Sequence, residues 1–361
     1  MRKLYCLLFG LLYAMTSAAQ GNVSIGKKYS LPSVILGEKR DYWIYLPPGY
    51  DDTTYAPARY PVVYLLDGDA NFHSFTGIQE ILAQGPYASI PQMIVVGILN
   101  TDRTRDLTPS PAGRKAYYDP KATLYANSGG NERFIAFLQK ELRPHIDSAY
   151  RTSGYNILQG HSFGGLTAVN LLLHHTRLFN AYVVIDPSLW WDQQLMLRQA
   201  DSILPRKDFT GTNIYVAMAH KVVVPQDTTT DHPMAIRAFS QQLQRRQPQG
   251  LRWQFHYYPE DDHGTVPLPA AFDALKFIFS GHQVHVKQAV QDPSLITKHY
   301  AELSARLGFT FKPTERYLDW LGSYCLRIGR TDQAAAIFRM AADLYPQSKH
   351  TMEQLTKTRQ R

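Results

Sequence analysis

The sequence predicts an α/β protein with a mostly parallel central sheet that helices cover on both faces, followed by a small all-α segment. Between residues 24 and 281, short β-branched or aromatic runs alternate with longer stretches of helical periodicity. Several of these runs are apolar throughout, as expected of strands buried on both faces. Beyond Gly281 helix formers dominate and no run typical of a strand remains. Strand and helix alternation of this kind indicates a parallel sheet with helices on either side.

The individual elements follow from periodicity and turn residues. Residues 40–46 alternate in polarity and end at Pro47-Pro48-Gly49, which is typical of a strand followed by a turn. Further strands are expected at 60–66, 93–99, 155–159, 179–185, 213–219 and 253–258. Helices are expected at 132–150, 164–175, 234–246 and 270–279. Pro144 should kink or end the first of these helices.

The first twenty residues predict an export signal. A basic start, Arg2-Lys3, precedes an apolar run at 4–15 and small residues at 16–19. The run is shorter than the roughly 20 apolar residues that a spanning helix needs. We therefore expect residues 1–20 to be removed, no membrane span, and a periplasmic or extracellular protein.

Composition limits the kinds of partner and of core. After removal of the signal Cys325 would be the single cysteine, so the fold must be held without an internal disulfide. With 361 residues and 44% hydrophobic composition, the chain can bury a core large enough to do this. The net charge of +8 is spread along the chain without a basic-aromatic array, so we expect no nucleic-acid partner.

The strongest motif is Gly160-His161-Ser162-Phe163-Gly164, which has the G-x-S-x-G pattern. It lies between an expected strand and an expected helix, as in the nucleophile elbow of the α/β-hydrolase fold. A tight turn there requires glycine at the flanking positions and lifts the Ser162 hydroxyl above the sheet. Ser162 is therefore the expected nucleophile, and the Phe163 amide an expected oxyanion donor. The alternative is a glycine turn of structural use only.

A serine nucleophile needs a base, and in this fold the chain order is serine, acid, histidine. His263 follows the last expected strand and is the expected general base. The acid should lie in the loop after residues 213–219, where Asp227 and Asp231 are available. We favour Asp231, which borders a helix start at Pro233, although an ordinary helix N-cap explains it equally well. A site without an acid is the third interpretation.

The second oxyanion donor should come from the loop after residues 60–66. That loop contains Asp67-Gly68-Asp69, in which Gly68 permits unusual backbone angles. The Asp69 amide is therefore an expected oxyanion donor, with a simple Asp-Gly turn as the alternative.

Two further groups fit a substrate cleft. Arg105 lies with Arg103 and Arg114 in one segment and could hold a carboxylate, catecholate or phosphate. Surface salt bridging is the alternative for these arginines. Trp190 and Trp191 follow an expected strand and could stack on a substrate ring, or they could seal the edge of the core.

These segments resemble the Putative esterase (esterase D-like) family. The resemblance covers roughly residues 24–281 and is carried by YLLDG at 64–68, RDLTP at 105–109, QGHSFGG at 159–165, DPSLWW at 186–191 and DHGTVP at 262–267. It is greatest to the siderophore-esterase branch, in which some members work with a Ser-His dyad. The resemblance implies hydrolysis of carboxylic esters without a lid domain, a metal or a cofactor. The alternatives are a feruloyl or acetyl esterase acting on plant polysaccharide, and a non-catalytic envelope scaffold or binding protein.

The resemblance leaves residues 282–361 unexplained. Within them, residues 317–350 are similar to one tetratricopeptide repeat, but only one clear copy is present. Because such repeats need about three copies to be stable alone, we expect a helical hairpin packed on the 21–281 domain. A module that binds a protein partner is the second interpretation.

Overall fold

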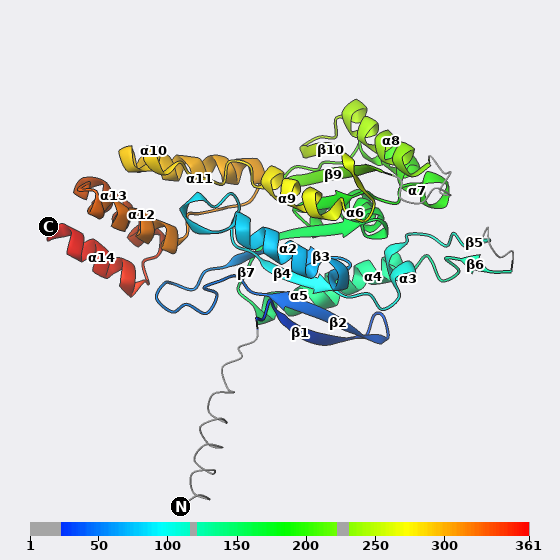
Figure 1. Ribbon diagram of the computed structural model, residues 1–361, viewed down its shortest axis with the longest axis horizontal. Coiled ribbons are helices and arrows are strands. Elements are labelled where there is room, and N and C mark those ends of the chain that lie inside the picture. Colours follow the sequence, from blue (N-terminus) through cyan, green and yellow to red (C-terminus); the bar gives the residue numbers. More distant parts are fainter. Residues whose placement is uncertain (1–22, 116–120, 222–230, 361) are drawn as a thin grey trace, which may run out of the picture.

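The computed structural model describes residues 23–115, 121–221 and 231–360. Its centre is an eight-stranded sheet in the order β1-β2-β4-β3-β7-β8-β9-β10 (Figure 1). The strands are β1 (Lys27–Ser33), β2 (Glu38–Tyr45), β3 (Tyr60–Leu65), β4 (Ile94–Ile98), β7 (Thr152–His161), β8 (Ala181–Ile185), β9 (Thr212–Lys221) and β10 (Leu251–Asp262). The pairs β1–β2 and β2–β4 are antiparallel, and all other neighbours are parallel. The predicted fold class, a mostly parallel sheet, is confirmed.

Helices cover both faces of this sheet. Those of the body are α2 (Gly68–Leu82), α3 (Arg103–Leu107), α4 (Asn131–Phe137), α5 (Arg143–Ala149), α6 (Phe163–His174), α7 (Trp191–Ile203), α8 (Asp231–Arg246) and α9 (Pro267–Ile278). Along β3, Val62 and Tyr64 belong to the core beneath α4, α6, α7 and α8, whereas Val63 and Leu65 belong to the core beneath α2 and α9. This alternation places one hydrophobic core on each face. A small hairpin of β5 (Arg114–Lys115) and β6 (Thr123–Leu124) projects from the body.

Three departures from the expected elements have physical causes. β1 is largely exposed at the sheet edge, so it lacks the apolar run that marks a buried strand. The helix expected at 132–150 runs on through Pro144 without ending, and a π-helical turn, Leu138–Leu142, lies directly before α5 and accommodates the proline within the helix. Residues 68–82 form helix α2, where the sequence predicted only a loop at its start.

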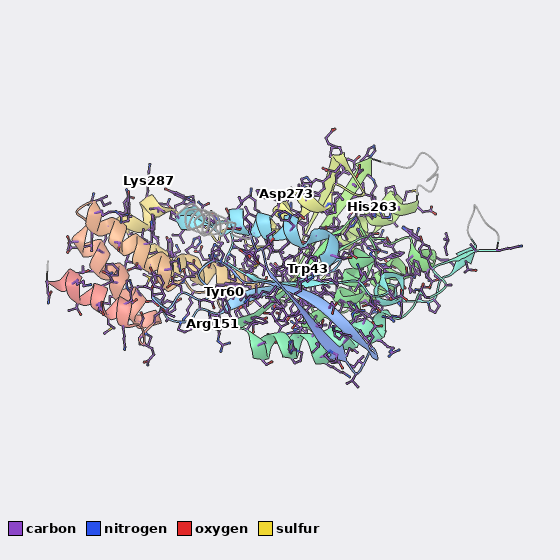
Figure 2. The ribbon with its side chains drawn as sticks, turned by 60° about the horizontal axis from the view of Figure 1, so that its bottom comes forward. Trp43, Tyr60, Arg151, His263, Asp273 and Lys287 are labelled. Carbon is purple, nitrogen blue, oxygen red and sulfur yellow. The ribbon has the colours of Figure 1, made fainter. Side chains whose placement is uncertain are left out.

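The C-terminal segment contains helices only. These are α10 (Val286–Gln291), α11 (Ser294–Leu307), α12 (Glu315–Arg327), α13 (Thr331–Leu344) and α14 (Lys349–Arg359). Figure 1 places this helical segment at one end of an elongated molecule, and Figure 2 shows Lys287 of α10 far from His263. Within it α12 packs closely on α13, since a methyl group at Gly322 would lie 2.6 Å from the Phe338 ring.

The helical segment packs on the amino-terminal ends of the parallel strands. Phe309 and Phe311 contact Tyr155, near the start of β7, with ring centroids 5.4 and 5.3 Å away. The buried Glu315 accepts a 2.7 Å hydrogen bond from the Ala56 amide of the loop before β3. The segment therefore adds to the core of the body. Within the described residues no helix is long and apolar enough to cross a bilayer; the expected export signal lies outside them.

Candidate active site

Ser162 occupies a strained turn between β7 and α6. Its backbone angles, φ 59° and ψ −116°, are rare for a residue with a side chain. The turn is tight enough that a methyl group at Gly160 would lie 2.2 Å from the Gly164 carbonyl oxygen. Because such strain persists only where the surroundings enforce it, it marks Ser162 as a functional position.

The segment after β8 contacts this serine directly. The Oγ atoms of Ser162 and the buried Ser188 lie 3.2 Å apart, and the Ser188 amide donates a 3.1 Å hydrogen bond to the Ser162 carbonyl. Among the described residues this is the hydrogen bond of the Ser162 hydroxyl, and none joins it to His263. Catalytic hydrogen bonds often form only when substrate is bound.

His263 follows β10 and is paired with Asp186, the residue directly after β8. The His263 Nδ1 lies 2.6 Å from Asp186 Oδ2, and the Asp186 side chain is 2% exposed. The expected acid, Asp231, is instead an exposed residue at the start of α8, and Asp227 lies outside the described residues. The choice of Asp231 was wrong because the acid was sought one strand too late. The carboxyl ends of neighbouring parallel strands meet at one sheet edge, so a carboxylate directly after β8 also reaches His263.

Asp186 is held in its ionised form by three hydrogen-bond donors. The Ala219 amide donates to Oδ1 at 2.9 Å, while His263 and His232 both reach Oδ2. Burial by itself would raise the pKa of Asp186, but the hydrogen bonds from His232 and His263 outweigh it and hold that pKa well below its usual range. The carboxylate is therefore available to orient His263 at neutral pH.

A second histidine, His161, lies against the ring of His263. The two ring centroids are 4.3 Å apart at an interplanar angle of 43°. Burial, with the nearby His263, lowers the pKa of His161 to about 4. His161 is therefore neutral at pH 7, and its Nε2 is buried without a hydrogen-bond partner among the described residues.

The chain is similar to known proteins over most of its α/β body. The chain matches the Putative esterase family over residues 33–265, more than half of its length. The chain belongs to this family.

Its relatives agree on the activity. The Ferri-bacillibactin esterase BesA of Bacillus subtilis is 28% identical over 251 residues, covering 66% of this chain and 85% of BesA. The Siderophore enterobactin esterase of Emericella nidulans is 25% identical and covers 60% of this chain and 81% of its own. The crystal structure of an IroE-like serine hydrolase from Shewanella oneidensis superposes with a TM-score of 0.79 at 34% identity, covering 88% of this chain and 99% of that one. The protein is a serine carboxylic-ester hydrolase.

In this esterase one arginine, Arg103, joins the two segments expected to supply oxyanion donors. Its guanidinium binds both carboxylate oxygens of Asp67, at 2.6 and 3.0 Å, and also donates to the His161 carbonyl at 3.2 Å. Asp67 precedes α2 in a left-handed conformation, φ 53°, and Asp69 lies in the first turn of α2. First-turn amides have no partner inside their own helix, and the amides of Asp69 and Phe163 are both of this kind. Arg103 thus holds the start of α2 at a fixed position relative to the start of α6.

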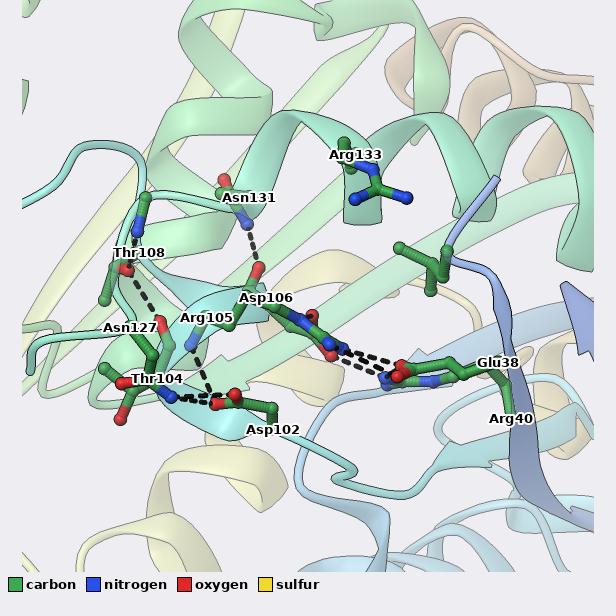
Figure 3. A network of polar contacts seen from close by, with 12 residues as sticks. Glu38, Arg40, Asp102, Thr104, Arg105, Asp106, Thr108, Asn127, Asn131 and Arg133 are labelled. Carbon is green, nitrogen blue, oxygen red and sulfur yellow. Dashed lines mark hydrogen bonds and ion pairs between the residues drawn. The ribbon is translucent and has the colours of Figure 1, made fainter. Parts of the chain in front are cut away.

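Arg105 has a different place from the expected one. Its guanidinium binds Glu38 at 2.6 Å and Asp106 at 2.7 Å, and these carboxylates also bind the buried Arg40 (Figure 3). The hydrogen bonds to Asp106 and Glu38 raise the pKa of Arg105. Because its donors are engaged in this network, Arg105 is a structural residue. The prediction that Arg105 contacts substrate is not supported, and among the described arginines of that segment Arg103 lines the cleft instead. The side chain of Arg114 is outside the description.

The two tryptophans separate into two roles. Trp191 is 1% exposed and its indole N–H lies 3.2 Å from Ser110 Oγ, so it seals the core. Trp190 is half-buried and lies 6.2 Å from the Phe163 ring, which also meets Tyr125 at 5.6 Å and the Arg103 guanidinium at 5.4 Å. Trp190, Phe163 and Tyr125 form an aromatic wall beside the nucleophile.

An open cleft of about 410 Å³ adjoins the elbow. Its polar lining is Asp67, Asp69, Asn71, Asn100, Arg103 and His161, and Gly264 and Pro267 complete it. The cleft is therefore polar where the carbonyl of a bound ester would meet the α2 helix start.

Asp186, His232 and His263 also bring possible metal-ligand atoms within 4.8 Å of one another. The histidine nitrogens already lie 2.6 and 3.0 Å from Asp186 Oδ2. Ligands around a tetrahedral zinc at about 2.0–2.1 Å are roughly 3.3 Å apart, so these contacts are too short to enclose an ion. They are hydrogen bonds.

Sequence reasoning missed Asp186, Ser188, His232 and the structural use of His161. Asp186 and Ser188 lie within the DPSLWW segment that carries the family resemblance. Their place in that segment, directly after an expected strand, was the signal that could have identified them. No local pattern marks His232.

Proposed function

We propose that the esterase cleaves siderophore-type esters through an acyl-enzyme on Ser162, with His263 as general base and Asp186 as the acid that orients it. The observation that carries the proposal is the 2.6 Å contact between His263 Nδ1 and Asp186 Oδ2, next to a strained elbow serine. A carboxylate only accepts hydrogen bonds, so His263 carries its proton on Nδ1 and has a lone pair on Nε2. That nitrogen is the base for Ser162.

The reaction consists of two acyl transfers. The Ser162 oxygen attacks the ester carbonyl while His263 Nε2 takes its proton, and the C–O bond to the leaving alcohol breaks as His263 returns that proton. Water then attacks the acyl-enzyme in the same way and releases the acid and Ser162. Asp186 remains ionised throughout and stabilises the protonated His263.

The amides of Phe163 and Asp69 are the proposed donors to the oxyanion. Both lie at helix starts, where partial positive charge and free N–H groups favour an anion. Removing one such donor typically lowers kcat by about 10²–10³. Asp69 contributes its main-chain N–H and not its side chain in this role. Substitutions of Asp69 that leave the backbone conformation unchanged should therefore keep the activity.

The substrate class rests on two features. BesA and the Emericella nidulans relative are named as esterases of siderophores. Trp190 and Tyr125 are half-buried around the buried Phe163 next to the elbow and offer ring surface for aromatic acyl groups. Arg103 lines the cleft with a partly exposed guanidinium. The alternatives from the sequence, esters of plant polysaccharide and a non-catalytic scaffold, have no support among these relatives.

The site of action is part of the proposal. Residues 1–20 have the order of an export signal, so the enzyme would work in the periplasm or outside the cell. A protein partner for the helical segment stays a prediction.

A substrate panel tests the proposal. We expect Ser162→Ala to abolish turnover of p-nitrophenyl acetate, and the wild type to hydrolyse a trilactone siderophore far faster than feruloyl arabinose or acetylated xylan. Hydrolysis that survives Ser162→Ala would overturn the mechanism. Preference for a polysaccharide ester would overturn the substrate class and leave the mechanism standing. A fluorophosphonate that labels the wild type but not Ser162→Ala would identify the nucleophile independently.

A further inference from the structure

A second imidazole shares the acid of the active site. His232, the second residue of α8, places Nε2 at 3.0 Å from Asp186 Oδ2, the oxygen that His263 Nδ1 contacts at 2.6 Å. The His232 side chain is 20% exposed, against 48% for His263. His232 is therefore the more buried of two histidines on one carboxylate oxygen.

The protonation of the nitrogens that face Asp186 follows from hydrogen bonding. The ionised carboxylate can only accept, and its other oxygen already accepts from the Ala219 amide at 2.9 Å. Both imidazoles must therefore present an N–H to Oδ2. Asp186 itself has a positive φ of 40°, a strained backbone conformation for a residue with a side chain, and its carboxylate is held by these three donors.

The rings also constrain each other. His232 meets His263 edge to face, with centroids 5.3 Å apart at 85°, and His161 lies against His263 at 4.3 Å. The titratable groups around His263 are thus Asp186 from β8, His161 from β7, His232 from α8 and the adjacent Asp262 of β10. Asp67 and Arg103 lie next to His161, where both contribute to the electrostatics of His161. Asp186 is the acceptor that His232 and His263 share.

We propose that His232 is a positioning residue that fixes the Asp186 carboxylate and limits how much of its charge stabilises a protonated His263. This inference rests on the proposed role of His263 as the base. Because His232 and His263 donate to the same oxygen, the hydrogen bond from His232 uses part of the negative charge of Oδ2 that would otherwise stabilise a protonated His263. His232 thereby competes with His263 for the negative charge of Oδ2, while it holds the carboxylate in the direction that orients the base.

Two substitutions separate these effects. His232→Leu removes the donor, so the carboxylate loses a fixed direction and its charge acts on His263 alone. We expect kcat to fall about tenfold with KM little changed, because only the transition state needs the oriented base. Protonated His263 becomes more stable, so the acidic midpoint of the kcat/KM profile should rise by about half a pH unit.

His232→Gln is the conservative variant, because its amide nitrogen reaches about as far as the imidazole Nε2 and donates a neutral N–H. It should restore most of kcat and bring the acidic midpoint back toward that of the wild type. His174→Leu, which removes an exposed histidine bonded to Gln199, controls for loss of a histidine elsewhere. Profiles on p-nitrophenyl acetate and thermal unfolding curves would be measured for all of them.

The outcomes distinguish this inference from the proposed function. If Ser162→Ala is inactive but His232→Leu has the wild-type kcat and midpoint, the positioning role is wrong and the mechanism stands. If the Leu and Gln variants lose equal activity and stability without any movement of the midpoint, His232 only packs, and the inference again fails. If Ser162→Ala remains active, the proposed mechanism itself fails.

Discussion

The two ends of the parallel sheet treat left-handed backbone in opposite ways. At the carboxyl end, three residues with positive φ carry functional side chains: Asp67, Ser162 and Asp186. At the amino end, where the helical segment packs, the positive φ angles before β9 and near the start of β7 belong to Gly211 and Gly154, and Gly308 closes α11. Glycine adopts such angles freely, whereas other residues are strained by about 1–3 kcal/mol. Gln247, before β10, is the exception at the amino end, with φ 44°. At the carboxyl end the strained residues are Ser162 itself, Asp67 of the cleft and Asp186 beside His263.

Polar contacts differ in the same way. Near the elbow, Ser162 has one hydroxyl contact and His161 Nε2 has none among the described residues. Under the helical segment, the buried Glu315 binds Ala56, Ser348 and Thr351. The described polar groups at the elbow therefore have few partners, whereas Glu315 has several; Tyr317 Oη of α12 is the exception in the helical segment, because it is buried without a hydrogen-bond partner among the described residues. The predictions below test this contrast, beginning with the largest effect.

Asp186→Asn should lower kcat by about 10³–10⁴-fold. An asparagine can present an N–H to His263 Nδ1, which favours the tautomer that cannot take the Ser162 proton, and it cannot stabilise an imidazolium. Steady-state hydrolysis of p-nitrophenyl acetate would measure the loss. The matched control is Asp231→Asn, in the exposed residue at the start of α8, which should retain wild-type rates. The reverse pattern would restore Asp231 as the acid.

Arg103→Gln should lower kcat by about 10- to 100-fold, because the α2 start would no longer be fixed against the elbow. Arg105→Gln removes the same charge two residues away, from the network with Glu38 and Asp106. That control should lose thermal stability while its kcat stays near the wild-type value. Equal kcat losses in both variants would show that charge, and not the bridge between helix starts, is what matters.

Stability should fall as the pH is lowered from 6.5 to 4, through one half-buried histidine at each end of the sheet. Burial lowers the pKa of His161 and of His282 to about 4, from 6.5. Within this window unfolding takes up one proton per histidine, so each lowers stability by about 1.4 kcal/mol for every pH unit of acidification. Urea unfolding at several pH values should show a shallower slope for His161→Phe and for His282→Phe. An unchanged slope in both would contradict the burial of neutral rings.

Ser162→Gly should raise the free energy of unfolding by about 1 kcal/mol while abolishing activity, since glycine relieves φ 59° and ψ −116°. Gly154→Ala, at φ 93°, is the counterpart at the amino end and should destabilise by a similar amount. Its added methyl group meets nothing nearer than 3.8 Å, so strain and not a clash is measured. Denaturant unfolding of both variants measures the change in the free energy of unfolding, which should be positive for Ser162→Gly and negative for Gly154→Ala. A destabilised Ser162→Gly would mean that the elbow is not strained.

Several features were predictable because they depend on neighbours in sequence. The apolar run of β3 and the glycines of the elbow are local patterns, and they located the sheet and Ser162. Helix α2 was missed because its glycine-rich start, Gly68, suits a turn equally well. A methyl group there would lie 2.6 Å from the backbone of Gly97, and that close packing on β4 is visible only in three dimensions.

The sequence by itself determined the α/β class and the family resemblance, which rest on short-range periodicity and contiguous motifs, and it pointed to Ser162 and His263 as the proposed nucleophile and base through the elbow motif and the chain order. Only the tertiary structure decided the acid, the separate duties of Arg103 and Arg105, and the sharing of Asp186 by two histidines. The two contacts of Asp186 with His232 and His263 join residues 46 and 77 positions apart, and Arg103 reaches Asp67 over 36 positions. They arise because parallel strands bring their carboxyl ends to one edge, where the geometry of the sheet, and not the order of residues, sets which side chains meet.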